Sequence, residues 1–127
     1  MRVAVVKNIL DANSRIAREN RKLFDNHGLA VINLLCSPGA GKTTLLEQMG
    51  EHFEGQLKIG VIEGDIQTTL DAERVAAAGV QAVQIETDGA CHLDANMIKN
   101  ALENLDLNGL DLLVIENVGN LVCPAEF

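Results

Sequence analysis

Between residues 34 and 44 the chain reads Leu34-Leu35-Cys36-Ser37-Pro38-Gly39-Ala40-Gly41-Lys42-Thr43-Thr44, a short apolar segment followed by a glycine-rich turn that ends in Gly-Lys-Thr. Glycines lack a Cβ atom, so successive backbone N–H groups can face the oxygens of a phosphate chain, and a following helix adds the partial positive charge of its N-terminus. Lys42 would add a full positive charge, and the Thr43 hydroxyl is a ligand that Mg²⁺ accepts. The stretch therefore predicts a phosphate-binding loop.

The residues on both sides of this turn support the prediction. The pattern G-x-x-x-x-G-K-[ST] is met except at its first position, where Cys36 stands in place of glycine. Residues 30–35 form an apolar, partly β-branched run of strand length, and residues 44–49 are good helix formers. The alternative is an ordinary glycine-rich turn between a strand and a helix, with a surface lysine. The residues that we expect to contact the nucleotide phosphates are Ser37, Gly39, Ala40, Gly41, Lys42, Thr43 and Thr44.

Length and composition are those of one globular domain. The chain has 127 residues, of which 47% are hydrophobic, enough for an ordinary core. Its net charge of -8 and its lack of Tyr and Trp argue against nucleic acid as a partner, because a polyanion is repelled and bases find no aromatic platform. No run approaches the roughly 18 to 20 apolar residues of a membrane helix, and the apolar part of residues 1–7 is too short for a signal peptide. We therefore predict a cytoplasmic protein without a membrane partner.

Apolar residues and turn signals divide the rest of the chain into alternating elements. An amphipathic pattern from Asn8 to about Asn26 predicts a helix that ends at His27-Gly28, so that a helical segment (1–28) precedes the main domain (29–127). Strand-like runs at 30–35, 57–62, 80–85 and 110–115 alternate with helical patterns at 42–53, 67–77 and 92–104. Such alternation favours parallel strands joined by right-handed crossovers. Together with the phosphate-binding loop, it predicts the doubly wound α/β sheet of a P-loop NTPase.

Acidic clusters follow two of the predicted strands. Glu63-Gly64-Asp65 follows the second strand and Glu116-Asn117-Val118-Gly119 follows the fourth, and we expect both strands to run beside the first. Ligands collect at the carboxyl ends of such strands, and Mg²⁺ prefers oxygen ligands. We therefore predict that Asp65 and Glu116 act with Lys42 in catalysis and hold Mg²⁺ with Thr43, and that the Gly119 N–H approaches the γ-phosphate. Alternatively, the carboxylates cap the next helix or face solvent.

The chain contains three cysteines, which favours free thiols or metal ligands over a disulfide framework. Cys91 and His92 are adjacent at a predicted helix start, and Cys123 lies four residues after Gly119, the end of the second acidic cluster. Thiolates with one imidazole suit Zn²⁺ or Ni²⁺, and three protein ligands would leave a fourth position open. The alternative is that these cysteines are buried as small apolar residues.

Four motifs, in this order, resemble the HypB family of GTPases, which help to insert nickel into [NiFe]-hydrogenase. They are the phosphate-binding loop at 37–44, Glu63-Gly64-Asp65, Gly89-Ala90-Cys91-His92-Leu93-Asp94-Ala95, and Glu116-Asn117-Val118-Gly119-Asn120-Leu121-Val122-Cys123-Pro124. The resemblance covers nearly the whole chain. It implies Mg²⁺-dependent GTP hydrolysis, with Ni²⁺ or Zn²⁺ bound by Cys91, His92 and Cys123. We expect turnover to be slow, because the sequence offers no arginine in an obvious position to stabilise the transition state. It also implies a nucleotide-dependent homodimer that works with a HypA-type nickel chaperone and the hydrogenase large-subunit precursor.

The chain departs from that family in two respects. No Cys-x-x-Cys-Gly-Cys element or His-rich tract precedes the first predicted helix, and no N-K-x-D element that reads guanine occurs before Phe127. We therefore expect the first part of a G domain, in which the preference for GTP over ATP rests on the resemblance alone. Two other functions remain open, a P-loop small-molecule kinase and a non-catalytic module for metal binding or dimerisation. A urease-type nickel GTPase is disfavoured. Resemblance to that group would imply a Cys-Pro-His sequence, whereas Cys91 and His92 are adjacent here.

Overall fold

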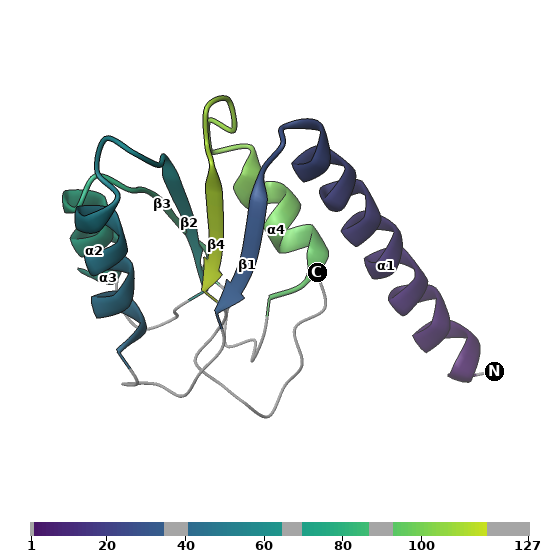
Figure 1. Cartoon of the computed structure of the whole chain (residues 1–127). Helices are drawn as coiled ribbons and strands as arrows, with labels where there is room; N and C mark the ends of the chain where they lie inside the picture. Colours follow the sequence, from purple (N-terminus) through teal and green to yellow (C-terminus); the bar gives the residue numbers. More distant parts are fainter. Residues whose placement is uncertain (1, 35–40, 65–69, 87–92, 117–127) are drawn as a thin grey trace.

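Four parallel strands form one sheet in the order β1-β4-β2-β3 (Figure 1). The computed structural model describes residues 2–34, 41–64, 70–86 and 93–116. The strands are β1 (Ala30–Leu34), β2 (Ile59–Glu63), β3 (Gln81–Gln84) and β4 (Leu112–Glu116). The helices are α1 (Arg2–Asn26), α2 (Lys42–His52), α3 (Leu70–Ala77) and α4 (Ala95–Leu102). The parallel, doubly wound α/β fold predicted from the sequence is confirmed.

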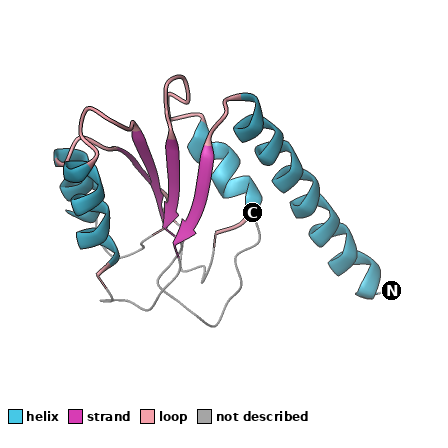
Figure 2. Ribbon diagram, in the orientation of Figure 1, coloured by secondary structure: helices cyan, strands magenta, loops and turns pink. Residues whose placement is uncertain are grey.

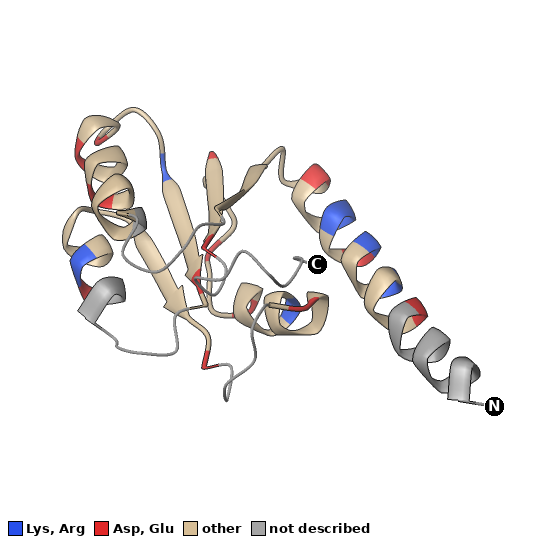
Figure 3. Cartoon of the chain, turned by 90° about the horizontal axis from the view of Figure 1, so that it is seen from below, with Lys and Arg blue, Asp and Glu red and all other residues tan. Residues whose placement is uncertain are grey.

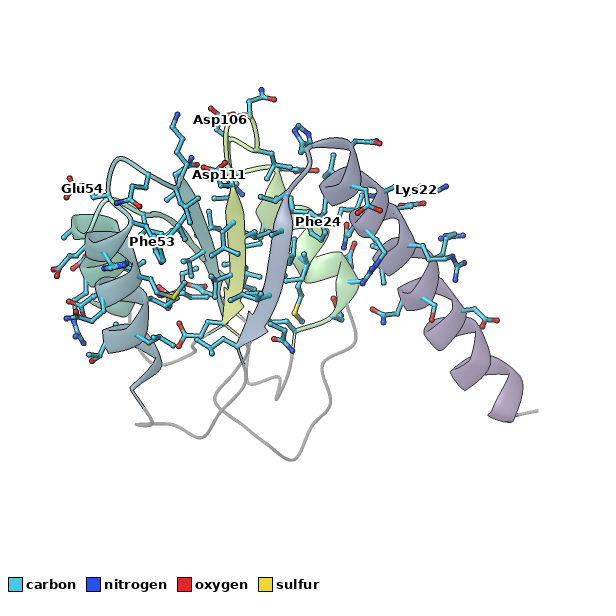
Figure 4. All side chains as sticks on the ribbon, in the orientation of Figure 1. Lys22, Phe24, Phe53, Glu54, Asp106 and Asp111 are labelled. Atoms are coloured by element: carbon cyan, nitrogen blue, oxygen red, sulfur yellow. The ribbon has the colours of Figure 1, made fainter. Side chains whose placement is uncertain are left out.

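Helices cover both faces of the sheet, with α2 and α3 on one face and α4 and α1 on the other (Figure 2). Successive residues of a strand point to opposite faces, so each strand contributes to two apolar clusters. Val61 and Val114 pack with Leu46 of α2 on one face. Ile62 and Ile115 pack with α4 on the other. Figure 4 shows the labelled Phe24 of α1 pointing toward the sheet. Phe24 is partly buried and packs against the cluster that contains Ile62 and Ile115.

Strand order corrects one prediction. We expected both the second and the fourth strands to run beside the first, but β4 lies between β1 and β2 and pairs with each of them. Among the described strands, only β4 is therefore a direct neighbour of β1, the strand that leads into the predicted phosphate-binding loop. The reason is that strand order depends on where each crossover connection packs, and a residue pattern along the chain does not contain that information.

Element ends differ from the predicted ones by a few residues. Helix α1 starts at Arg2, earlier than the predicted Asn8. Adding a residue to an existing helix requires much less free energy than nucleating a new one. Strands β2 and β4 each run one residue further than predicted, to Glu63 and Glu116. The ladder continues past them, since the Gly64 N–H donates to the Glu116 carbonyl at 2.8 Å. In the described ranges, no helix combines the length and apolar character needed to cross a membrane.

Gly50 of α2 provides a test of this packing. A Cβ atom at Gly50 would lie 2.9 Å from the Ala78 carbonyl oxygen and 2.8 Å from Cγ2 of Val80. An ordinary helix interior gains up to about 1 kcal/mol from Gly→Ala. Here the backbone of the α3–β3 turn would have to move. We therefore expect Gly50→Ala to lower the free energy of unfolding by about 1 to 3 kcal/mol, measured by urea denaturation.

Gln48→Ala is the matched control, because Gln48 is exposed on the same helix. It should change the free energy of unfolding by no more than about 0.5 kcal/mol. A Gly50→Ala variant that is as stable as the wild type would show that α2 does not press against the α3–β3 turn.

Candidate functional site

The carboxyl ends of the strands and the first turn of α2 lie at the same end of the sheet (Figure 2). This is the end at which ligands bind in parallel α/β sheets. Figure 3 views the molecule from this side and shows acidic positions near the ends of the central strands.

Gly41 is the N-cap of α2 and has a left-handed backbone, with φ of 93° and ψ of 21°. Its carbonyl accepts the first helical hydrogen bond, from the Leu45 N–H at 2.9 Å. Among the described residues, no atom lies within 4 Å of a Cβ built at Gly41, and the left-handed backbone angles themselves favour glycine there. The glycine turn that the sequence predicted is therefore present at its helical end.

The other residues predicted to bind phosphate divide into two groups. Lys42 is the first residue of α2, and Thr43 and Thr44 follow it in the first turn, Thr43 partly buried and Thr44 exposed. Ser37, Gly39 and Ala40 lie outside the described residues. The N-terminus of α2 points its first N–H groups toward the end of the sheet where the candidate site lies, an arrangement that favours an anion.

Glu116 is the last residue of β4 and is only 3% exposed. It is the register partner of Leu34, the last residue of β1, so its backbone lies beside the strand end that precedes the predicted phosphate-binding loop in the sequence. Alternation along the strand puts its side chain on the same face as Val114, the face covered by α2. Glu116 is therefore within the site region and on the side of the predicted phosphate-binding helix.

Glu63 is a residue to which the sequence reasoning assigned no role. The hydrophobic pattern predicts that it follows the second strand, but it is the last residue of β2 and is fully buried. Its register partners are Glu116 on one side and Gln84 on the other. A sequence signal was available, because alternation from Val61 places residue 63 on the α2 face. Its full burial beside Glu116, at the carboxyl end of the sheet, marks Glu63 as a functional candidate.

The two glutamates form a pair of neighbouring carboxylates. Adjacent strands of a sheet lie about 4.8 Å apart, so Glu63 and Glu116 begin from backbone positions at that spacing. Two ionised carboxylates at neighbouring positions repel each other, and a cation bound by both reduces the repulsion. Carboxylate oxygens with the Thr43 hydroxyl make an oxygen-only donor set, which fits Mg²⁺ better than a softer metal.

The remaining predicted site residues cannot be placed. Asp65, Gly119, Cys91, His92 and Cys123 all lie outside the described residues. Across the described ranges, no three His, Cys, Asp or Glu side chains come together as a metal-binding group. The roles predicted for Asp65 and Gly119, and the nickel or zinc ligands, remain predictions.

Comparison with known proteins agrees with this architecture. The family model described as "CobW/HypB/UreG, nucleotide-binding domain" matches residues 30–127. The probable hydrogenase maturation factor HypB of Methanocaldococcus jannaschii is 45% identical over 123 residues, covering 97% of this chain and 56% of that protein. The hydrogenase maturation factor HypB of Azotobacter chroococcum mcd 1 is 53% identical over 127 residues, covering 98% of this chain and 41% of that protein.

A solved structure is also similar. The crystal structure of HypB from Helicobacter pylori in complex with nickel superimposes with a TM-score of 0.82 and 47% sequence identity, over 89% of this chain and 54% of that one. The chain thus spans about half the length of the relatives that it matches. Since both the family model and these relatives match most of its residues, the chain belongs to the CobW/HypB/UreG family, as a homologue of the hydrogenase maturation factor HypB.

Proposed function

We propose that this chain binds and slowly hydrolyses GTP with Mg²⁺, and that hydrolysis is coupled to nickel delivery during [NiFe]-hydrogenase maturation. The observation that carries the proposal is the position of Glu116. This buried carboxylate ends the strand beside β1, at the point where the phosphate-binding loop begins, and faces the helix that Gly41 caps. The relatives named as hydrogenase maturation factors support the biological role.

Each residue would have a distinct part in hydrolysis. The N–H groups at the start of α2 and the charge of Lys42 would bind the β- and γ-phosphates and stabilise the negative charge that builds up there. Thr43, Asp65 and Glu116 would hold Mg²⁺, which supplies further positive charge to the phosphate oxygens. Glu63 would support Glu116 from the neighbouring strand. Turnover would be slow, because the four motifs contain no arginine that could complete charge neutralisation.

Nickel is the cargo in this proposal rather than a permanent cofactor. Cys91, His92 and Cys123 would bind Ni²⁺, or Zn²⁺ in its place, through two thiolates and one imidazole. Cys123 follows Gly119 closely in the sequence, so a change at the γ-phosphate could alter the spacing of the ligands. We further propose that the protein works in the cytoplasm as a GTP-dependent homodimer. Its partners would be a HypA-type nickel chaperone and the hydrogenase large-subunit precursor.

Nickel affinity measured in two nucleotide states tests the coupling. We expect Ni²⁺ affinity with a non-hydrolysable GTP analogue to differ from that with GDP by about fivefold or more, the lower end of typical coupling between sites. Titration calorimetry with Ni²⁺ in excess Mg²⁺ measures both values. Cys91→Ser should lose nickel binding in both states, whereas Cys36→Ser should keep the nickel affinity measured without nucleotide.

Two outcomes contradict the proposal in different ways. Equal nickel affinities in the two nucleotide states would remove the coupling between hydrolysis and metal release. Nickel binding without any nucleotide binding would identify a metal-binding module instead of a GTPase.

A further inference from the structure

A pocket opens at the amino ends of the strands, opposite the end of the sheet that holds the candidate functional site. It has a volume of about 680 Å³ and is lined by Gly50 and by residues 54–59, 79–81 and 109–111. These segments connect α2 to β2, α3 to β3 and α4 to β4. A pocket of this size is large enough for a small ligand or for side chains of another protein. We call it the amino-end pocket.

Much of the lining of the amino-end pocket is apolar. Ile59, Val80 and Leu110 line it and are buried, so they form its inner surface. Leu57 also lines it and is 40% exposed. Single exposed apolar side chains are common on protein surfaces, but one that lines a pocket can be covered by whatever enters the pocket. An occupant with an apolar part would therefore remove Leu57 from water.

The charged residues around this pocket are mainly acidic. Glu54 and Asp111 line it, and both are exposed. Asp106 is held close by, because its N–H donates to Oε1 of the lining residue Gln81 at 3.2 Å. Figure 4 shows these three acidic residues at the same end of the molecule. Among the described lining residues, only Lys58 is basic.

Two helix ends add to the negative potential of the pocket. Helix α2 ends at His52 and α3 at Ala77, and both helices run toward the amino ends of the strands (Figure 1). The C-terminus of a helix has a partial negative charge, because its last carbonyl groups have no partner within the helix. The lining residues Glu54 and Gly79 each follow one of these helix ends by two residues. The pocket thus combines apolar surface with a negative potential.

The wall between β2 and β4 is fixed by reciprocal hydrogen bonds. The Lys58 N–H donates to Oδ2 of Asp111 at 2.8 Å, and the Asp111 N–H donates to the Lys58 carbonyl oxygen at 2.8 Å. A Cβ atom built at Gly109 would lie 3.5 Å from Nζ and 3.7 Å from Cδ of Lys58. The stem of a cationic side chain of the protein itself therefore lies along a glycine turn at this end.

We propose that the amino-end pocket docks a basic segment of a partner protein, with an arginine or lysine side chain beside Asp111 and the helix ends. An apolar residue of the same segment would cover Leu57. Charge complementarity supports this occupant, since long basic side chains place a charged head near carboxylates while their stems cover apolar surface. Nucleotide is proposed to bind at the other end of the sheet, so the docking goes beyond the proposed GTPase function and does not depend on it.

Amide spectra of the ¹⁵N-labelled 127-residue chain both measure and locate the docking. The probe is a hexapeptide of alternating leucine and arginine with blocked ends. In the control peptide, citrulline replaces arginine, which keeps the size and most N–H groups but removes the charge. We expect the arginine peptide to shift the amide signals of Gly55, Gly79 and Gly109. The citrulline peptide should bind about tenfold more weakly, because hydrogen bonds to charged groups are the stronger ones.

Asp111→Asn tests the carboxylate without removing its structural hydrogen bond, because an amide oxygen can still accept from the Lys58 N–H. It should weaken binding of the arginine peptide by about threefold or more and leave the citrulline peptide unaffected, as expected for a partly exposed charge pair. Glu86→Gln is the matched control. It removes one negative charge from an exposed residue beyond β3, at the other end of the sheet, and should leave both affinities unchanged.

Leu57→Ser tests the apolar contact and should weaken both peptides alike, since each contains the same leucines. Circular dichroism checks that every variant is folded. A folded Asp111→Asn variant that binds the arginine peptide as the wild type does would overturn the proposal.

Three other results would also overturn the proposal. They are an arginine peptide that does not bind, signal shifts confined to the other end of the sheet, and spermidine binding as tightly as the arginine peptide, which would show only a general attraction of cations. Calorimetry with GTP on the same sample is read separately. Absence of nucleotide binding would contradict the proposed function, whereas the result with the arginine peptide would stand.

Discussion

Replacing Lys42 by alanine is expected to weaken nucleotide binding by about a hundredfold. Lys42 is the first residue of α2, directly after the left-handed Gly41, so it stands where a phosphate-binding lysine must begin. A hydrogen bond to a charged group contributes about 1.5 to 3 kcal/mol, and each 1.4 kcal/mol is a factor of ten in affinity. Titration calorimetry with GTP and with GDP, both in the presence of Mg²⁺, measures the loss.

Lys22→Ala is the matched control for this experiment. It removes the same charge from an exposed residue of α1 whose side chain points away from the sheet (Figure 4). Its nucleotide affinity should stay within about twofold of the wild type, because exposed charges so far from the site are screened by salt. If Lys42→Ala binds nucleotide as Lys22→Ala does, the turn at 36–43 is an ordinary connection between a strand and a helix.

Replacing Glu116 by glutamine is expected to lower GTP hydrolysis on the order of 100-fold while nucleotide still binds. Glutamine has nearly the size and shape of glutamate, so the buried end of β4 should keep its packing. It lacks the negative charge that Mg²⁺ requires of a carboxylate ligand. Phosphate release at saturating GTP and Mg²⁺ measures turnover, and calorimetry measures binding separately.

Two further glutamine variants show whether the effect is specific to the site. Glu63→Gln changes the register neighbour of Glu116 and should lower turnover by about tenfold, as a supporting group does. Glu54→Gln makes the same change at an exposed residue beyond the end of α2, away from the site, and should leave turnover unchanged (Figure 4). Equal turnover in Glu116→Gln and Glu54→Gln would exclude Glu116 from the magnesium site.

The predicted elements agree with the structure because their signals are local. Residues 30–35 were predicted as a strand and Ala30–Leu34 is one, while the helix predicted at 42–53 is Lys42–His52. Hydrophobic periodicity depends on neighbours a few residues apart, so one chain segment contains the whole signal. Element ends are less well determined, because the last residues of a strand depend on its neighbour in the sheet. The one-residue extension of β2 shows this, since it changes Glu63 from a loop residue into a buried one.

The same distinction between local and long-range signals applies to the residues of the candidate site. The left-handed Gly41 could be predicted, because only glycine adopts that conformation without strain and the Gly-Lys-Thr motif is contiguous. The pairing of Glu63 with Glu116 could not, because it depends on β4 lying between β1 and β2. The contacts of Asn13 and Asn20 with Ala95 join residues far apart in the chain, and no local pattern indicates them.

By itself, the amino-acid sequence determined the type and order of the elements, the glycine turn before α2 and, through its motifs, the family to which the chain belongs. These depend on backbone conformation and on periodicity over a few residues, which local side chains control. Only the tertiary structure decided the strand order, the adjacency of the two buried glutamates and the attachment of α1 to the start of α4. The physical reason is that each of these contacts joins distant segments, and its free energy depends on the packing of the whole sheet and its helices.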